Sequence, residues 1–340
     1  MGNSLAAVIK EEIGRHRHIT FARFMELALY CPELGYYRRG PAEVFGARGD
    51  FYTAGQLQPL WGDLLASFVS QLQRASGKDA QFGVLDLGAG RQDLRASFRQ
   101  WNYRAFDWNT EPLPGVFSGL VLANEFFDAQ PVHLLCRRKS GWRELGVEAT
   151  GDRFTFVDLD EISPSLAAYA QRYGEEVPVD GLLEASPIAG DWIARIDRLL
   201  MSGDVLVVDY GYEARELARF PDGTLLAYRR HVAITDLLSA PGTRDITAHV
   251  NFSYLQDRAL TGELEIAGES SLSEWALGVW DEQELADRWN AGDRRWQLQW
   301  KQLIFGMGPT FRVLHLRKRK PAEKLPPNKN ASVAGGVKDS

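Results

Sequence analysis

The chain has 340 residues, of which 45% are hydrophobic and 25% charged, a balance typical of a globular protein with a buried core. Its net charge of −6 argues against a general nucleic-acid binder, and Cys31 and Cys136 are too few for a disulfide framework. No stretch is long and apolar enough to cross a membrane, and the first residues lack the core of a signal peptide, so we expect a cytoplasmic protein.

Residues 1–78 are predicted to form a helical region. Leu5, Ile9 and Ile13 recur at helical spacing, and Thr20 is placed to cap a second helix that runs to Tyr30. A loop with glycine at both ends, GDFYTAGQLQPLWG (49–62), follows, and residues 60–74 have the pattern of an amphipathic helix.

Three short apolar runs predict strands of a parallel sheet with helices on both faces; they span residues 82–88, 119–123 and 203–209. A hairpin over 134–157 and a helix over 190–200 are expected between the second and third strands. Open α/β sheets bind ligands beyond the carboxyl ends of their strands. The candidate sites are therefore the three segments that follow the strands: 86–93, 124–131 and 209–212.

Residues 222–316 are predicted to be richer in strands and turns, and they end in a strand, FRVLHLRK (311–318). The last segment, 317–340, contains seven basic and two acidic residues and almost no apolar ones, which predicts a disordered, solvated tail. The expected organisation is a helical region with its loop (1–78), a domain with insertions (79–316) and the basic tail (317–340).

The stretch VLDLGAGRQDL (84–94) predicts a cofactor loop. A strand that ends in Gly88-Ala89-Gly90 lets a ligand approach the backbone closely. A dinucleotide loop would have its third glycine where Asp93 stands, and an acid there repels pyrophosphate. S-adenosyl-L-methionine (SAM) carries a sulfonium and an ammonium and no phosphate, so Asp86 before the glycines suits it. The SAM pattern has glycine in place of Gln92, so the loop favours SAM over NAD, and a plain tight turn without a ligand stays open.

A second carboxylate is expected to bind the ribose hydroxyls of such a cofactor, about 20 residues after the glycine loop. Asp107 lies 19 residues after Gly88 and qualifies by its spacing. Only 11 residues separate it from the strand that begins at residue 119, which is too few for another helix and strand.

The order of several long motifs resembles the MidA-like family of class I SAM-dependent methyltransferases, which includes a mitochondrial complex I assembly factor that methylates a protein arginine. The resemblance covers residues 10–316. Its motifs are ITFARFMELALYCPELGYY (19–37), GDFYTAGQLQPLWG (49–62), LGAG (87–90), ANEFFDAQPV (123–132), VVDYGY (207–212), DGTLLAYRRH (222–231), PGTRDITAHVNF (241–252) and GMGPTFRVL (306–314).

The resemblance implies an α/β fold, namely a Rossmann-like class I methyltransferase sheet with an N-terminal helical region and helical and β-rich insertions. It also implies site residues. Those near the methionine end of SAM are Asp86, Gly88, Ala89 and Gly90; those of the loop that closes over the cofactor are Gly49, Asp50, Phe51 and Thr53; and those that face the methyl acceptor are Asn124, Glu125 and Asp128.

The chain departs from the family pattern at three places. Gly55-Gln56 replaces Pro-Glu in the covering loop, and Gln92 replaces the third glycine. RAFDWNTEPLPG (104–115) resembles the family's third strand, with Trp108 as its tryptophan, so the acidic second strand and its helix are expected to be missing. On that alignment Asp107 adjoins the adenine pocket and binds the ribose only if it has been recruited.

Methyl transfer to an arginine needs carboxylates that hold the guanidinium and orient one nitrogen. Glu125 and Asp128 can supply them, and Asn124 can accept from a donor nitrogen. The alternative for Asp128 is a cap on a helix that begins at Ala129 or Pro131.

His249 in DITAHVNF is a candidate acid or base, with Asp245 four residues before it; the alternative is a structural histidine. Tyr210 and Tyr212, which follow Asp209, could form a substrate wall or pack on the edge of the core. No histidine has the spacing of a metal ligand set, so we expect no metal.

Two hypotheses remain. The first is a SAM-dependent methyltransferase that acts on a protein side chain such as arginine, with no nucleic-acid or membrane partner. The second is a non-catalytic binding or assembly protein on the same fold, with a degraded SAM site. An NAD enzyme is disfavoured by Asp93 and by the downstream motifs.

Overall fold

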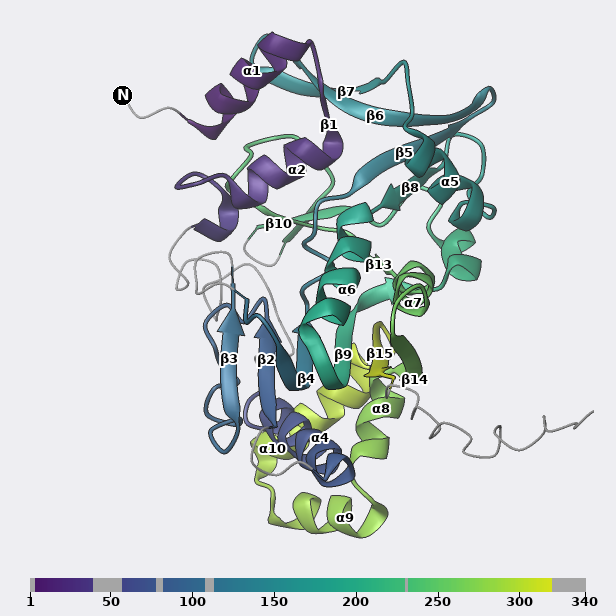
Figure 1. Cartoon of the computed structure of the whole chain (residues 1–340). Coiled ribbons are helices and arrows are strands. Elements are labelled where there is room, and N and C mark those ends of the chain that lie inside the picture. The colour runs from purple at the N-terminus through teal and green to yellow at the C-terminus, as the bar shows by residue number, and fades with distance from the viewer. Residues whose placement is uncertain (1–3, 39–56, 78–81, 108–112, 230–231, 320–340) are drawn as a thin grey trace, which may run out of the picture.

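The computed structural model describes residues 4–38, 57–77, 82–107, 113–229 and 232–319. Its centre is a seven-stranded sheet in the order β14-β15-β9-β4-β2-β3, with β13 paired to β9 (Figure 1). The strands are β2 (Gly83–Leu87), β3 (Asn102–Phe106), β4 (Phe117–Asn124), β9 (Leu200–Tyr212), β13 (Val250–Asn251), β14 (Leu264–Ser271) and β15 (Phe311–Lys318). β3, β2, β4 and β9 are parallel, and β15 is antiparallel to β9.

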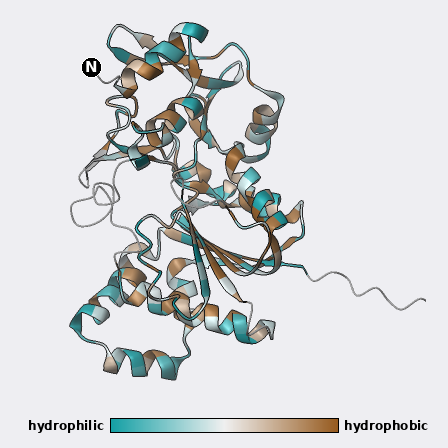
Figure 2. Cartoon of the chain, turned by 60° about the vertical axis from the view of Figure 1, so that its left-hand side comes forward, coloured by the Kyte–Doolittle hydropathy of each residue, from teal (hydrophilic) through white to brown (hydrophobic). Residues whose placement is uncertain are grey.

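Helices cover both faces of this sheet, as the apolar strands predict. One face packs on α4 (Leu60–Ser76), α8 (Leu272–Val279) and α10 (Arg294–Lys301), and the other on α6 (Pro187–Leu199) and α7 (Phe252–Leu260). Successive strand residues alternate between the two cores, with Val84 in the first and Leu85 in the second. Figure 2 shows the hydrophobic residues concentrated in these strands. The expected Rossmann-like α/β class is confirmed.

A second sheet lies beyond the carboxyl ends of the parallel strands, at the top of Figure 1. Its order is β1-β6-β5-β8, with β7 paired to β6. One face packs on α1 (Leu5–His16) and α2 (Phe21–Tyr30), and the other on α5 (Pro164–Tyr173). The strands are β1 (Ile19–Thr20), β5 (His133–Arg138), β6 (Gly141–Thr150), β7 (Arg153–Asp158) and β8 (Leu182–Ala185).

A small third sheet, β11-β10-β12, is formed by β10 (Leu226–Arg229), β11 (Val232–Ile234) and β12 (Asp245–Thr247). Short helices η1 (Tyr36–Arg38), η3 (Ala214–Arg219) and η4 (Gln302–Met307) and the helix α9 (Glu282–Ala291) complete the described elements. Within the ranges that the structure describes, no helix is long and apolar enough to cross a membrane.

Most of the predicted elements are confirmed, and some are corrected. Thr20 caps α2 through its side chain, and β15 spans the predicted 311–318, so Arg317 and Lys318 at the start of the expected tail are strand residues. The hairpin over 134–157 is a three-stranded meander, because a first turn at residues 139–140, just before Gly141, and a second at Gly151 separate its strands. The prediction that 222–316 is mainly strand and turn is wrong, since α7 to α10 lie there.

In the described residues a single strand, β3, lies on this side of β2, which agrees with a sheet shortened by one strand-helix unit. β3 pairs in parallel with β2 along its whole length, from Gly83 opposite Asn102 to Leu87 opposite Phe106. It therefore fills the place beside β2 where the acidic strand belongs. The crossover from β2 to β3 consists of successive turns over residues 91–100, so this connection is short.

Three glycines, Gly83, Gly119 and Gly203, face one another across β2, β4 and β9. A Cβ on Gly119 would lie 2.1 Å from the Gly83 carbonyl oxygen, and one on Gly203 would lie 2.0 Å from that of Gly119. Gly119 and Gly203 also have φ of +139° and +125°, which L side chains rarely adopt. The close approach of these strands therefore depends on the glycines.

We predict that Gly119→Ala lowers the free energy of unfolding by about 2–4 kcal/mol, because the backbone must shift in the middle of the sheet. Gly14→Ala in α1 is the matched control, since nothing lies within 4 Å of the position of its Cβ and alanine favours a helix by up to about 1 kcal/mol. Denaturant titration measures both variants, and equal midpoints would contradict the close approach.

Candidate functional site

The glycine loop leaves β2 at the edge that faces the second sheet. Gly88 and Gly90 have φ of +71° and +50°, and the N–H groups of Gly88 and Ala89 both donate to the Phe106 carbonyl, at 2.8 and 3.2 Å. A Cβ on Gly88 would lie 2.9 Å from the ring of Phe126. The loop is thus held against the end of β3 and beside the segment that follows β4, where only glycine fits.

Asp86 precedes this loop and is buried, with an exposed fraction of 4%. The Tyr103 hydroxyl donates to its carboxylate at 2.7 Å. Burial and, to a lesser extent, the charge of Asp107 raise the pKa of Asp86 to about 7, against the lowering effect of this hydrogen bond. A buried carboxylate with one neutral donor and another acid nearby is stabilised by a cation.

Asp107 follows the last residue of β3, which lies opposite Leu87 of β2. It is half-buried, and its charge acts on Asp86. The two carboxylates therefore lie at the ends of neighbouring parallel strands, and Asp107 has the place of the ribose-binding acid that the sequence alignment leaves in question.

Gln92, which stands in place of the third glycine, keeps the backbone conformation of a glycine, with φ of +59°. Its side chain accepts from Arg95 Nε at 2.8 Å. Arg91 pairs with Asp93 at 3.0 Å, and both side chains are about 40% exposed, at 39% and 40%. The substitution therefore preserves the turn, at a cost of about 1–2 kcal/mol for a side chain in the left-handed region.

The expected residues of the covering loop, Gly49, Asp50, Phe51, Thr53, Gly55 and Gln56, lie outside the described residues, as does Trp108. Their roles at the cofactor stay predictions.

The end of β4 places two of the expected acceptor residues. Glu125 has φ of +50°, and its N–H donates to the Val208 carbonyl of β9 at 2.9 Å. Asn124 Nδ2 donates to Glu125 Oε1 at 3.4 Å, and Asn124 Oδ1 is buried without a hydrogen-bond partner. A left-handed non-glycine residue beside an unsatisfied amide oxygen is typical of a functional site.

Asp209, near the end of β9, holds the segment that follows β4. Its Oδ2 accepts from the N–H groups of Phe126 (3.2 Å), Phe127 (2.9 Å) and Asp128 (3.3 Å), and its Oδ1 accepts from that of Tyr210 (2.9 Å). The alternative role of Asp128 as a helix cap is wrong, because residues 125–132 form turns and bends and no helix begins there.

Asp128 and Asp209 are a coupled buried pair. Burial raises the pKa of Asp128 to about 7, and burial together with the charge of Asp128 raises that of Asp209 well above its ordinary value. The pKa of Asp209 is raised more strongly than that of Asp128, so the pair retains its proton on Asp209 and Asp128 is the member that ionises first.

Tyrosines surround these carboxylates. Burial raises the pKa of Tyr37, Tyr210 and Tyr228, and for each of them the charge of Asp128 adds to the effect. The Tyr37 hydroxyl lies 2.9 Å from both carboxylate oxygens of Asp245, and the Tyr30 hydroxyl donates to the Ala129 carbonyl at 2.8 Å.

The rings of Tyr30 and Tyr37 stack at 5.5 Å. Tyr30, Tyr37 and Tyr228 were not among the site residues expected from the sequence, although the ELGYY and LLAYRR motifs contain two of them. Tyr210 borders the carboxylates and also packs on Phe311 at 3.9 Å, so both of its alternatives stay predictions.

His249 lies at the margin of this group. Its ring is parallel to that of Tyr210 at 6.2 Å and edge-on to that of Phe220 at 5.3 Å. Burial and the charge of Arg219 lower its pKa, so the imidazole is neutral at pH 7, and its Nδ1 is buried without a hydrogen-bond partner. The preceding residue, Ala248, donates to the Asp128 carbonyl at 2.9 Å. Among the described residues, no group of three or more His, Cys, Asp or Glu side chains is placed to hold a metal ion.

Comparison with known proteins identifies the family. Residues 90–270, more than half of the chain, match the family described as "Putative S-adenosyl-L-methionine-dependent methyltransferase". The chain belongs to this family.

This chain is similar to curated proteins named "Protein arginine methyltransferase NDUFAF7, mitochondrial". The Danio rerio protein is 28% identical, over 71% of this chain and 68% of its own length. The Homo sapiens protein is also 28% identical, over 71% of this chain and 65% of its own length. The chain thus spans about two thirds of these relatives.

A solved structure from Burkholderia thailandensis is similar over almost the whole chain. It is bound to S-adenosyl-homocysteine, is 28% identical, covers 92% of both chains and has a TM-score of 0.81. The family and this similarity support SAM as the cofactor of this methyltransferase. The site fits SAM, because Asp86 is a buried carboxylate suited to an ammonium, Asp107 is placed for ribose hydroxyls, and the bend at Gly88 excludes a side chain.

We predict that SAM affinity falls as the pH decreases below 7, by up to about tenfold per pH unit. The affinity decreases in this direction because the pKa of Asp86 is raised in the free protein. At lower pH the carboxyl is protonated, and the cationic ligand binds only the carboxylate. The contribution becomes complete about one pH unit above this pKa, where Asp86 is fully ionised.

Calorimetric titration with SAM at several pH values measures this effect. Asp86→Asn is expected to weaken binding and to remove the pH dependence, whereas Asp93→Asn, an exposed carboxylate on the same loop, keeps both. The same pH slope in Asp86→Asn as in the unmodified protein would contradict the role of Asp86.

Proposed function

We propose that this methyltransferase transfers the methyl group of SAM to an arginine side chain of a protein. The observation that carries the proposal is the group of acidic residues at the ends of β4 and β9, Glu125, Asp128 and Asp209, with tyrosines around it. The printed name of the curated relatives supports the same acceptor.

A guanidinium is a planar cation with five N–H donors, so it suits a site of carboxylates and aromatic rings. Glu125 and Asp128 offer carboxylate oxygens, and the buried, unpartnered Oδ1 of Asn124 offers a further acceptor. Asp209 is committed to four backbone N–H groups, so we assign it the role of holding Asp128 and not of binding the acceptor.

SAM supplies an activated methyl group on its sulfonium. The residues of this chain then have two tasks, which are to orient one guanidinium nitrogen toward that methyl and to accept the proton that the nitrogen loses. Asp128 suits the second task, because its pKa of about 7 matches a proton acceptor that works near neutral pH. Neutral His249 is a further acceptor at the margin of the site.

The alternative of a degraded SAM site was based on Gln92 and on a missing acidic strand. Gln92 keeps the glycine conformation, and β3 occupies the place of that strand with Asp107 at its end. Both observations support an active enzyme. A cytoplasmic location stays a prediction, and the curated relatives are named as mitochondrial proteins.

We predict that Glu125→Gln and Asp128→Asn each lower the rate of arginine methylation by about a hundredfold or more and leave the SAM dissociation constant nearly unchanged. Glu265→Gln, an exposed residue of β14, is the control that keeps the full rate.

The test incubates the protein with SAM that carries an isotopic label in its methyl group and with synthetic peptides that contain one arginine, or one lysine in its place. Mass spectrometry locates the label. Label on lysine and not on arginine, or full rates in both site variants, would overturn the assignment of the acceptor.

A further inference from the structure

Glu184 is a buried carboxylate outside the acidic group of the site. It lies on β8 of the second sheet, opposite Leu134 of β5, and has an exposed fraction of 3%. Its Oε1 accepts from the N–H groups of Thr224 at 2.6 Å and Leu225 at 3.2 Å. A buried carboxylate is costly to retain unless it is hydrogen-bonded, so these contacts fix the segment that precedes β10.

The same segment holds the backbone of His249. The His249 N–H donates to Thr224 Oγ1 at 2.9 Å, so Thr224 connects β8 to the segment between β12 and β13. Two more contacts hold residues 221–223, which precede β10, close to β8. The Leu182 N–H donates to the Pro221 carbonyl at 3.0 Å, and a Cβ on Gly223, which has φ of +77°, would lie 2.5 Å from Glu184 Oε1.

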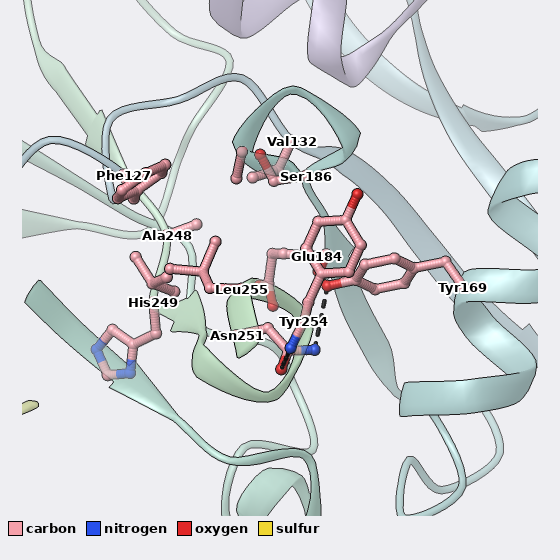
Figure 3. A pocket seen from close by; sticks show the side chains of 12 residues that line it. Phe127, Val132, Tyr169, Glu184, Ser186, Ala248, His249, Asn251, Tyr254 and Leu255 are labelled. Atoms are coloured by element: carbon pink, nitrogen blue, oxygen red, sulfur yellow. Dashed lines mark hydrogen bonds between the residues drawn. The ribbon is translucent and has the colours of Figure 1, made fainter. Parts of the chain in front are cut away.

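Glu184 lines a small internal cavity, shown in Figure 3. Glu184 Oε2 is buried without a hydrogen-bond partner. The cavity has a volume of about 20 Å³, and Tyr169, Ser186 and Asn251 are among its polar lining residues. That volume holds one water molecule, which needs polar partners of this kind.

We propose that Glu184 is a positioning residue that acts on His249 through Thr224. The second oxygen of Glu184 binds one water molecule. The inference rests on the proposed function, in which His249 borders the acceptor site. It assigns a role to the second sheet, since β8 fixes a residue at the margin of a site built on the central sheet. In Figure 3 the His249 ring points away from the cavity, so the connection runs through its backbone.

Two pairs of variants separate positioning from folding. Glu184→Ala removes the acceptor for Thr224 and Leu225, whereas Glu184→Gln keeps one carbonyl oxygen for them. Thr224→Val removes only the hydroxyl that accepts from His249, whereas Thr224→Ser keeps it. The valine and threonine side chains have nearly the same shape, so the second pair perturbs the packing least.

The measurement is the NMR spectrum of the histidine rings in the full chain labelled with ¹³C-histidine. Six histidines are present, and loss of one cross-peak in His249→Gln identifies the signal of His249. We expect this signal to move or broaden in Glu184→Ala and Thr224→Val and to stay in place in Glu184→Gln and Thr224→Ser. If Glu184→Ala fails to fold, all the histidine signals collapse together, and the threonine pair decides the outcome.

Methylation of an arginine peptide is the second readout. We expect kcat to fall about tenfold in the disrupting variants and to be rescued in the conservative ones, with the SAM dissociation constant unchanged throughout. An unmoved His249 signal in Thr224→Val, or equal shifts in Thr224→Val and Thr224→Ser, would overturn the inference. Absence of SAM binding in the unmodified protein would instead overturn the proposed function and leave the NMR result standing.

Discussion

The carboxylate of Asp209 is the contact on which the site depends. It lies at the end of β9, is fully buried, and accepts four backbone N–H groups, three of them from consecutive residues after β4. A turn has few internal acceptors for its buried N–H groups. A carboxylate that accepts from these N–H groups therefore stabilises the turn. This contact allows residues 126–128 to fold over Gly88 instead of continuing as a strand or starting a helix.

The remaining parts of the site follow from where Asp209 holds this turn. The Phe126 ring meets the glycine loop, the Ala129 carbonyl accepts from Tyr30, and the Asp128 carbonyl accepts from Ala248. The turn thus contacts the cofactor loop, α2 of the N-terminal region and the segment that contains His249. Burial of Asp128 beside Asp209 is also the cause of its raised pKa, so the structural contact and the proton acceptor are physically linked.

The sequence predicted the parallel strands of the central sheet and the glycine loop well, because strand ends and glycine loops have local signals, while the roles of the cofactor and acceptor residues stay predictions. Asp86 and Gly88 follow from the pattern of one strand and its turn. The role of Asp107 was harder to predict, because it depends on which strand β3 pairs with. The 11 residues between Asp107 and the strand that begins at residue 119 do not specify this pairing.

Tyr30, Tyr37 and Glu184 could not be found locally, because they come from the N-terminal helices and from β8, and only the tertiary fold brings them near the site. The spacing of the tryptophans in WALGVW (275–280) and RRWQLQW (294–300) is typical of helix faces, and α8 and α10 contain most of these residues.

The most direct test of the account is a crystal structure of the full chain with S-adenosyl-homocysteine bound. We expect the ligand to lie along the carboxyl edge of β2 and β3, with its amino group at Asp86, its ribose at Asp107 and its sulfur directed toward Glu125 and Asp128. A ligand that contacts neither Asp86 nor Asp107, or one whose sulfur is directed away from the end of β4, would contradict it.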